Sequence, residues 1–280
     1  MVLGSTGCLG TSLEMVLKNE KNIQYKGFSH SDLEITDSKE IHYAIKQVKP
    51  SIIINTVALI GINFCEKNPQ KTMAINAYSV FELAKICRQK KITFVQASTH
   101  AVFNGETQFS YSEKDMPNPI NIYGHSKLIA EYFVKMNLKD YYIFRFPTMY
   151  GPRRNKTLGF VDKMIANMQE GRSLKIAGDR IDCPSYALNI SKKINYILNR
   201  KFKRGIYHIF DLGRISYYDF IKKIAEEIGF RGKIKKVKDK EFPSLAPNPL
   251  RLPLKSKKGC TNVSWKKAIK MYVRNESIKC

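Results

Sequence analysis

The first 150 residues alternate short apolar runs with amphipathic patterns, and this rhythm restricts the fold more than any other feature of the sequence. The apolar runs lie at 1–4, 23–29, 50–58, 92–98 and 141–146, and the helical patterns at 8–19, 38–48, 69–88 and about 121–136. Strands that alternate with helices predict a parallel sheet covered by helices on both faces. The run at 51–57 is apolar on both faces, as a central strand of such a sheet must be.

A different pattern begins after Gly151-Pro152. Helices are predicted at about 159–170, 187–199, 217–228 and 263–273, and strands at 173–177 and 205–210, while the four prolines in 242–256 indicate an extended loop. Ser216 suits the N-cap of the third of these helices, and Gly229 suits its C′ position. We therefore expect a domain at 1–150 and a smaller C-terminal α/β lobe at 151–280, with about 186–210 returning to the first sheet.

Composition narrows the class of protein. The chain has 280 residues, of which 43% are hydrophobic, so it can bury a large core. It contains no apolar run of about 18 residues, so we expect no membrane-spanning helix, and the first ten residues lack the features of a secretion signal. The six cysteines are scattered without metal-ligand spacing, which predicts reduced thiols in a cytoplasmic protein and no metal site.

The formal net charge is +24. One interpretation is a nucleic-acid-binding protein. The lysines, however, lie in short runs such as "RQKK" and "KIKKVKDK" and form no long basic stripe with interleaved aromatic residues. We therefore predict no nucleic-acid partner. The charge favours anionic small molecules instead, including sugar nucleotides and phosphorylated cofactors.

A glycine-rich turn follows the first apolar run. Gly4, Gly7 and Gly10 of "GSTGCLG" stand at the first strand–helix junction, where the backbone must turn tightly and approach a pyrophosphate closely. The helix N-terminus that follows supplies N–H groups and the positive end of the helix dipole. The turn, with Thr6, Cys8 and Leu9, predicts a dinucleotide-binding site in a Rossmann-type, doubly wound α/β fold.

In such folds, the residue at the end of the second strand contacts the adenosine ribose of the cofactor. Ser29 and His30 stand there, and an acid that would select NAD through the 2′-hydroxyl is missing at these two positions. NADPH is therefore favoured as cofactor, with NADH still open. Asp37 either lies near the adenine or is simply an acid at a helix N-terminus.

Seven segments together resemble one enzyme family. They occur in the order and spacing of extended short-chain dehydrogenases/reductases, and more narrowly the chain resembles the dTDP-4-dehydrorhamnose reductase branch; they are "GSTGCLG", "INTVA", "AINAYS", "STHAVFNG", "YGHSK", "RFPTMYGP" and "GDRIDCPSY". The resemblance implies NAD(P)H-dependent reduction of a nucleotide-activated 4-keto-deoxysugar, in deoxysugar and surface polysaccharide biosynthesis. A homodimer is left open.

Reduction of a ketone needs a proton for the new alkoxide as well as a hydride, and "YGHSK" offers a proton relay. Tyr123 and Lys127 are i and i+4, so both project from one helix face, and the ammonium can lower a phenol pKa that is ordinarily near 10. Thr99, at a strand end, can donate a hydrogen bond to the substrate carbonyl. The resemblance adds that Lys127 bonds the nicotinamide ribose. The alternative is a surface Tyr, a surface Lys and a strand-end Thr.

The resemblance also assigns supporting positions. Asn55 and Ala58, after the third strand, and Arg145, at the end of the fifth, correspond to positions that line the cofactor. "GDRIDCPSY" resembles a "DQxGxPT" segment that faces the sugar nucleotide: Asp179 matches, while Arg180 and Cys183 depart from it. Arg180 either pairs with the substrate diphosphate or is a solvated loop charge.

His100 departs from the branch, which usually has Asp there in a "STDYVF"-type segment. An imidazole beside Thr99 can bond a sugar hydroxyl or move a proton, and the alternative is a partly buried His that supports the loop. Two other functions stay open: a sugar-nucleotide epimerase-reductase that uses His100, and a non-catalytic NADP-binding regulatory subunit, as found among relatives of this branch.

Overall fold

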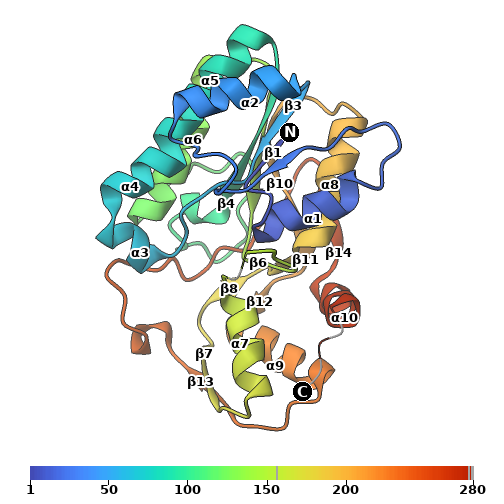
Figure 1. Cartoon of the computed structure of the whole chain (residues 1–280). Coiled ribbons are helices and arrows are strands. Elements are labelled where there is room, and N and C mark those ends of the chain that lie inside the picture. The colour runs from blue at the N-terminus through green and yellow to red at the C-terminus, as the bar shows by residue number, and fades with distance from the viewer. Residues whose placement is uncertain (156, 277, 279–280) are drawn as a thin grey trace.

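Parallel strands form the main sheet of the larger of two lobes (Figure 1). Within residues 1–155, 157–276 and 278, which this computed structural model describes, the sheet has six strands in the order β10-β5-β4-β3-β1-β2. Their bounds are β1 (Val2–Leu3), β2 (Gly27–Phe28), β3 (Ile52–Asn55), β4 (Thr93–Thr99), β5 (Tyr141–Phe146) and β10 (Gly205–His208). All pair in parallel, which confirms the predicted Rossmann-type sheet.

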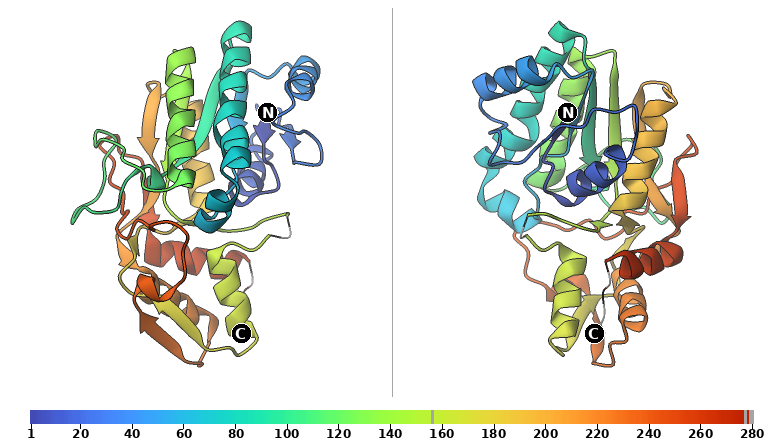
Figure 2. Two further views of the ribbon diagram at one scale, coloured as in Figure 1. Left: turned by 90° about the vertical axis from the view of Figure 1, so that its left-hand side faces the viewer. Right: turned by 45° about the vertical axis from the view of Figure 1, so that its right-hand side comes forward.

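Helices cover both faces of this sheet. On one face lie α2 (Ser38–Val48), α5 (Ser79–Lys90) and α6 (Ile122–Asn137), and on the other lie α1 (Cys8–Leu17) and α8 (Ala187–Asn199) (Figures 1 and 2). Successive strand residues point to opposite faces, so Ile53 packs in the core with Leu83, whereas Ile54 packs with Leu13 and Ile194. This explains why the third strand is apolar throughout.

The helix predicted at 69–88 is built from several pieces. The chain forms α3 (Ile62–Lys67), α4 (Pro69–Met73) and a π-helical turn, η1 (Ala74–Tyr78), before α5 begins. Asn76 in that turn bonds both the N–H and the carbonyl of Leu59, at 2.7 and 3.0 Å, and donates to Ser126 Oγ at 3.0 Å. Its side chain therefore ties the loop after β3 to α6.

The smaller lobe packs three helices against a pair of parallel strands. These are α7 (Phe160–Gln169), α9 (Tyr217–Ile228) and α10 (Trp265–Asn275), with β7 (Leu174–Ala177) and β13 (Ile234–Val237). The predicted caps of α9 are confirmed, because Ser216 Oγ accepts the Asp219 N–H at 3.0 Å and Gly229 has a φ of +83°.

Short strand pairs join the two lobes. They are β6 (Met149–Tyr150) with β9 (Ser185–Tyr186), β8 (Ile181–Asp182) with β12 (Ile215–Ser216), and β11 (Phe210–Leu212) with β14 (Thr261–Ser264). Two 3-10 turns, η2 (His100–Val102) and η3 (Asp239–Glu241), lie near the same junction. After β9 the chain re-enters the larger lobe, where α8 packs on α1 and β10 pairs with β5.

The proline-rich segment at 242–256 also links the lobes. It contains no helix or named strand, as predicted, and its carbonyl groups accept from Tyr111 N–H at 2.9 Å and Ile181 N–H at 2.7 Å. The first contact is to the larger lobe and the second to β8. The segment therefore holds the two lobes together along one side of the junction.

Two sequence predictions concern the whole chain. No helix in the described part of the chain is long and apolar enough to cross a membrane. The described cysteines are Cys8, Cys65, Cys87, Cys183 and Cys260, and all five are buried free thiols, while Cys280 lies outside the described residues.

Candidate active site

The glycine turn has the geometry that a dinucleotide requires. Gly4 has a φ of +79°, and a Cβ on Gly10 would lie 2.1 Å from the Gly4 carbonyl oxygen, so neither position accepts another residue without rearrangement. Gly7 is the N-cap of α1, and the first intrahelical bond runs from Thr11 N–H to the Gly7 carbonyl. The N–H groups at the helix start therefore have no intrahelical partner and are available to bind an anion.

Cys8 and Leu9 contribute to this site through their backbone. Both side chains are buried, Leu9 in the core of the larger lobe and Cys8 facing Asp162 and Glu276 of the smaller lobe, and burial raises the pKa of the Cys8 thiol to about 12. The thiol is therefore unreactive, and the N–H groups of these residues are what they can offer to a ligand. The carbonyl of Thr6 accepts from the N–H groups of Arg154 and Asn155, both at 3.0 Å, so the chain after β6 covers the turn.

A cavity of about 390 Å³ lies beside the turn, where the adenosine end of a cofactor would reach. Ser29 lines it, but His30 does not; the His30 side chain is 86% exposed and lies 3.4 Å from Glu34. The lining charges are three cations and two acids: Lys18, Lys26, Arg154, Glu14 and Asp32.

Ser29 and His30 themselves carry no acid, as the sequence showed, but Asp32 brings a carboxylate beside Ser29. Its carboxylate accepts from the N–H and the hydroxyl of Ser29, at 2.8 and 2.6 Å. These hydrogen bonds lower the pKa of Asp32, so it is a carboxylate at neutral pH. The sequence argument considered only Ser29 and His30, and the turn that follows β2 brings Asp32 back beside Ser29.

Three predicted cofactor residues have other roles. Asp37 is the N-cap of α2 and accepts from the N–H groups of Lys39 and Glu40, at 2.7 and 3.3 Å, which is the helix-terminus alternative. Asn55 is fully buried and bonds Gln96 and the Val57 N–H, at 3.0 and 3.1 Å. Its side chain is thus directed into the sheet and not toward a cofactor. Ala58 is half-buried in the loop after β3.

Arg145, the third predicted cofactor residue with partners inside the protein, is paired with Glu131. It is 2% exposed, and its Nε and Nη2 donate to the two oxygens of Glu131 at 2.8 and 2.6 Å. Ser98 Oγ donates to the same carboxylate at 2.6 Å. The guanidinium also lies over the Phe103 ring, 5.2 Å from its centroid. Arg145 is therefore one half of an internal ion pair with Glu131, and its contact with a cofactor stays a prediction.

The predicted proton-relay residues do meet. Thr99 ends β4, and its side chain accepts from the Ala101 N–H at 3.1 Å and hydrogen-bonds the Tyr123 hydroxyl. Tyr123 and Lys127 lie on α6, where Asn121 Oδ1 caps the helix by accepting the Gly124 N–H at 2.9 Å. Thr99 and Tyr123 therefore come together where β4 ends, on the side of the sheet where β1 leads into the glycine turn, and Lys127 lies one helical turn along α6 from Tyr123.

Burial sets the proton affinities of this pair. It raises the pKa of Tyr123 to about 12, against a smaller lowering by the Thr99 hydrogen bond. It also lowers the pKa of Lys127 to about 8, against the attraction of Glu131. We expected Lys127 to lower the pKa of Tyr123. Burial raises that pKa instead, because removal from water destabilises the phenolate more than its neighbours stabilise it.

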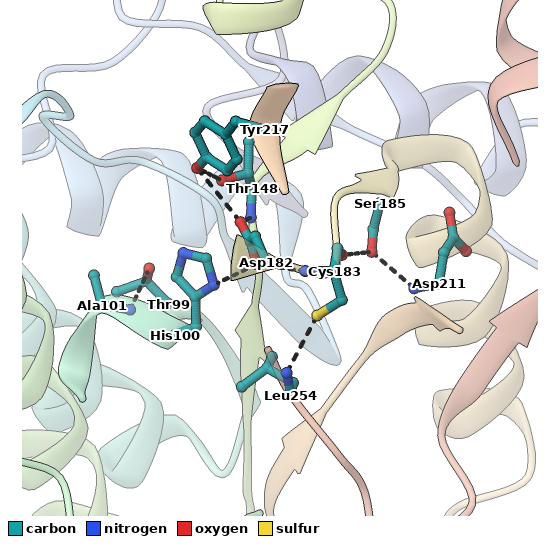
Figure 3. Close-up of polar contacts among 10 residues, drawn as sticks. All are labelled: Thr99, His100, Ala101, Thr148, Asp182, Cys183, Ser185, Asp211, Tyr217 and Leu254. Carbon is teal, nitrogen blue, oxygen red and sulfur yellow. Dashed lines mark hydrogen bonds and ion pairs between the residues drawn. The ribbon is translucent and has the colours of Figure 1, made fainter. Parts of the chain in front are cut away.

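His100 and Asp182 meet at the junction of the lobes (Figure 3). Nδ1 of His100, in η2, lies 3.1 Å from Oδ1 of Asp182, in β8, and both side chains are buried. The sequence analysis missed Asp182, although it stands within the "GDRIDCPSY" segment. The signal that could have found it is its place beside Asp179 and Arg180, which were considered.

Asp179 and Arg180 both contact Asp239. The Asp179 carboxylate accepts the Asp239 N–H at 2.8 Å, and Arg180 Nε lies 2.5 Å from the Asp239 carboxylate. The Arg180 guanidinium also lies over the Tyr217 ring, 5.7 Å from its centroid. The charge of Arg180 is thus paired within the smaller lobe, which differs from a solvated loop charge, and its pairing with a substrate diphosphate stays a prediction. In the described residues, no cluster of His, Cys, Asp and Glu could hold a metal ion.

Comparison with known proteins agrees with this geometry. The family model described as RmlD substrate binding domain matches residues 1–278. The spore coat polysaccharide biosynthesis protein SpsK of Bacillus subtilis is 27% identical over 284 residues, which cover 100% of this chain and 98% of SpsK.

Solved structures are similar over the same extent. A dTDP-4-dehydrorhamnose reductase from Clostridium acetobutylicum superposes with a TM-score of 0.92 at 28% identity, covering 99% of this chain and 98% of that one. The dTDP-4-dehydrorhamnose reductase from Bacillus anthracis, in complex with NADP, superposes with a TM-score of 0.92 at 27% identity, covering 98% of each chain. The family resemblance drawn from the motifs is confirmed, and the chain belongs to the RmlD substrate binding domain family.

Proposed function

We propose that the protein is an NADPH-dependent reductase of a nucleotide-activated 4-keto-deoxysugar. The observation that carries the proposal is the contact of Thr99 with the Tyr123 hydroxyl, with Lys127 one helical turn further along the same face. Similarity to two dTDP-4-dehydrorhamnose reductases of known structure supports the substrate class. Similarity to a spore coat polysaccharide biosynthesis protein supports a role in making a deoxysugar for a surface polysaccharide.

The glycine turn fits a dinucleotide. A Cβ on Gly10 would fill the space against Gly4, and the N–H groups of Cys8 and Leu9 stand free at the start of α1 to bind a diphosphate. Lys26 and Arg154 in the adjoining cavity provide positive charge for a 2′-phosphate. NADPH supplies the hydride when it is bound, and the residues of the chain supply the proton.

Tyr123 is the proton donor in this proposal. Because burial holds its pKa at about 12, the hydroxyl stays protonated at neutral pH and is ready to neutralise a developing alkoxide. Thr99, bonded to that hydroxyl, supplies a second hydrogen-bonding group for the same oxygen. Lys127, with a pKa of about 8, exchanges protons readily near neutrality and can return one to the tyrosine.

A substrate screen tests the proposal. The purified protein is mixed with NADPH and several nucleotide-linked 4-keto-6-deoxysugars, and loss of reduced-cofactor absorbance is followed. Steady oxidation that depends on the sugar supports the reductase. NADPH binding without turnover of any keto sugar would favour the regulatory-subunit alternative instead.

The place of the reaction in the cell belongs to the same proposal. Five buried free thiols suit a reducing compartment, which supports a cytoplasmic enzyme. Deletion of the gene, followed by sugar analysis of the surface polysaccharide, should show the loss of one deoxysugar. An unchanged sugar composition would count against the polysaccharide role.

A further inference from the structure

The contact between His100 and Asp182 leaves one imidazole nitrogen without a protein partner. His100 is 8% exposed and Asp182 is 2% exposed, and Nδ1 faces the carboxylate. The second nitrogen, Nε2, points away from Asp182 (Figure 3), and no residue in the described part of the chain hydrogen-bonds it. Nδ1 is fully enclosed, whereas Nε2 is not, so Nε2 is open to a hydrogen bond from a molecule bound at the junction.

Asp182 is held firmly from the other side. Its carboxylate accepts the Cys183 N–H at 2.7 Å and the Thr148 N–H at 3.2 Å. The Tyr217 hydroxyl lies 3.5 Å from it and 2.7 Å from Thr148 Oγ1. Burial alone would raise the pKa of Asp182, but His100 and these hydrogen bonds lower it overall, so the carboxylate stays charged and orients the ring through Nδ1–H.

Positions 100 and 182 both differ from the pattern of the dTDP-4-dehydrorhamnose reductase branch. His100 stands where the branch has Asp, and the "DQxGxPT" pattern laid along Asp179–Ser185 puts its glycine at Asp182. This corrects the sequence analysis, which named Cys183 as the departure. The carboxylate thus stands at position 182 in this chain, whereas the branch has it at position 100, on the other side of the junction. An Asp at position 100 would face Asp182 at close range, and two carboxylates there repel one another.

The place of His100 in the site limits what Nε2 can contact. His100 directly follows Thr99, whose side chain bonds the Tyr123 hydroxyl. A sugar whose carbonyl approached Thr99 and Tyr123 would bring its neighbouring carbon atoms to the imidazole. The group at Nε2 is then a substituent next to the reacting carbonyl.

We propose that His100, held by Asp182, is a specificity-determining residue whose Nε2 hydrogen-bonds a hydroxyl group next to the reacting carbonyl of the sugar. The proposal rests on the reductase function above. A hydroxyl suits Nε2 in either protonation state, because it donates to the neutral ring and accepts from the protonated one. A sugar with a deoxy carbon there would cover Nε2 and leave it unpaired, and sites of this kind reject substrates that lack the bonded hydroxyl.

The variant His100→Asn isolates Nε2. An Asn amide nitrogen takes the place of Nδ1 and keeps the bond to Asp182, whereas nothing replaces Nε2. Turnover is compared on two nucleotide-linked 4-keto-6-deoxyhexoses, one with the C3 hydroxyl and one without it. His42→Asn, at an exposed histidine on α2, is the matched control.

We expect wild type to prefer the hydroxylated sugar by at least tenfold in kcat/KM. His100→Asn should lose at least tenfold on that sugar, stay within about threefold on the deoxy sugar, and keep NADPH affinity. Equal discrimination in wild type and variant would overturn the inference while leaving the reductase function intact, as would a wild type that does not discriminate. A wild type that reduces neither sugar would overturn the reductase function, and the inference with it.

A second set of variants tests the pairing without relying on one substitution. His100→Asp should lower both Tm and kcat/KM, because it sets two carboxylates against each other. Adding Asp182→Gly, which restores the branch pattern at both positions, should recover much of the loss in Tm. Strictly additive effects of the two substitutions would contradict the coupling.

Discussion

Arg145 and Glu131 form a buried bidentate ion pair beside Lys127, the lysine of the proposed proton relay. Glu131 is fully buried on α6, one helical turn after Lys127, and Arg145 on β5 donates to both of its carboxylate oxygens. Ser98, the residue before Thr99, donates to the same carboxylate. The pair thus ties together α6, β4 and β5, the three elements that carry or support the proton relay.

Replacing Arg145 with Met should destabilise the protein strongly. The change leaves the Glu131 charge buried and unpaired, which typically costs about 3–5 kcal/mol of unfolding free energy. Urea unfolding measures it. Arg172→Met is the control, because Arg172 pairs with Glu170 on the surface, where ion pairs contribute about 0–1 kcal/mol. Equal effects of the two changes would contradict the structural role of Arg145.

Asp37→Ala should lower stability without changing cofactor affinity. Loss of an N-cap side chain typically costs about 1 kcal/mol, and Lys39→Ala, which keeps the capped N–H, should cost little. Thermal unfolding and NADPH titration are measured on the same samples. A clear loss of NADPH affinity with unchanged stability would restore the interpretation of Asp37 as an adenine contact.

Wild type should bind NADPH at least as tightly as NADH, and Arg154→Gln should weaken NADPH alone. Arg154 lines the cavity beside Ser29, donates to the Ser5 carbonyl at 3.2 Å and pairs with Glu14, and we expect it to bind the 2′-phosphate there. We expect at least a tenfold loss of NADPH affinity by fluorescence titration, with NADH within about twofold. Lys46→Gln, on an exposed face of α2, is the control. Equal losses for both cofactors would place the 2′-phosphate elsewhere.

The order of elements in the larger lobe followed from local sequence pattern. Apolar runs and amphipathic periods gave most helices of the sheet lobe nearly to the residue, as with α2 and α8. The i and i+4 spacing likewise placed Tyr123 and Lys127 on one face of α6. These predictions succeed because they depend on residues close in the chain.

Contacts between residues that are far apart in the chain could not be predicted from local sequence pattern. Asp182 reaches His100, and Arg145 reaches Glu131, only once distant segments pack together. Asn55 and Arg145 were predicted to lie near a cofactor because the family resemblance assigns that role to their positions. Side chains alternate between the faces of a strand, however, and both of these point into the interior, which position along the strand alone does not decide.

Lys127→Met should stabilise the protein while damaging activity. The folded protein releases the Lys127 proton near pH 8, against an ordinary pKa of 10.5, so the unfolded chain binds more protons between these values. The unfolding free energy of wild type should therefore rise with pH across that window relative to the variant. At pH 7 the variant should melt at a higher temperature, because it avoids burying an ammonium. A lower Tm at pH 7 would contradict the cost assigned to this burial.

The most direct test of the proton relay is the turnover of Tyr123→Phe. The ring stays and only the hydroxyl is lost, so packing and NADPH affinity should hardly change, and Tyr43→Phe at an exposed tyrosine on α2 is the matched control. A positioned general acid typically contributes about 10²- to 10⁴-fold in rate, so kcat on the keto sugar should fall by that factor. A Tyr123→Phe variant that kept more than about a tenth of wild-type kcat with unchanged NADPH affinity would contradict the account.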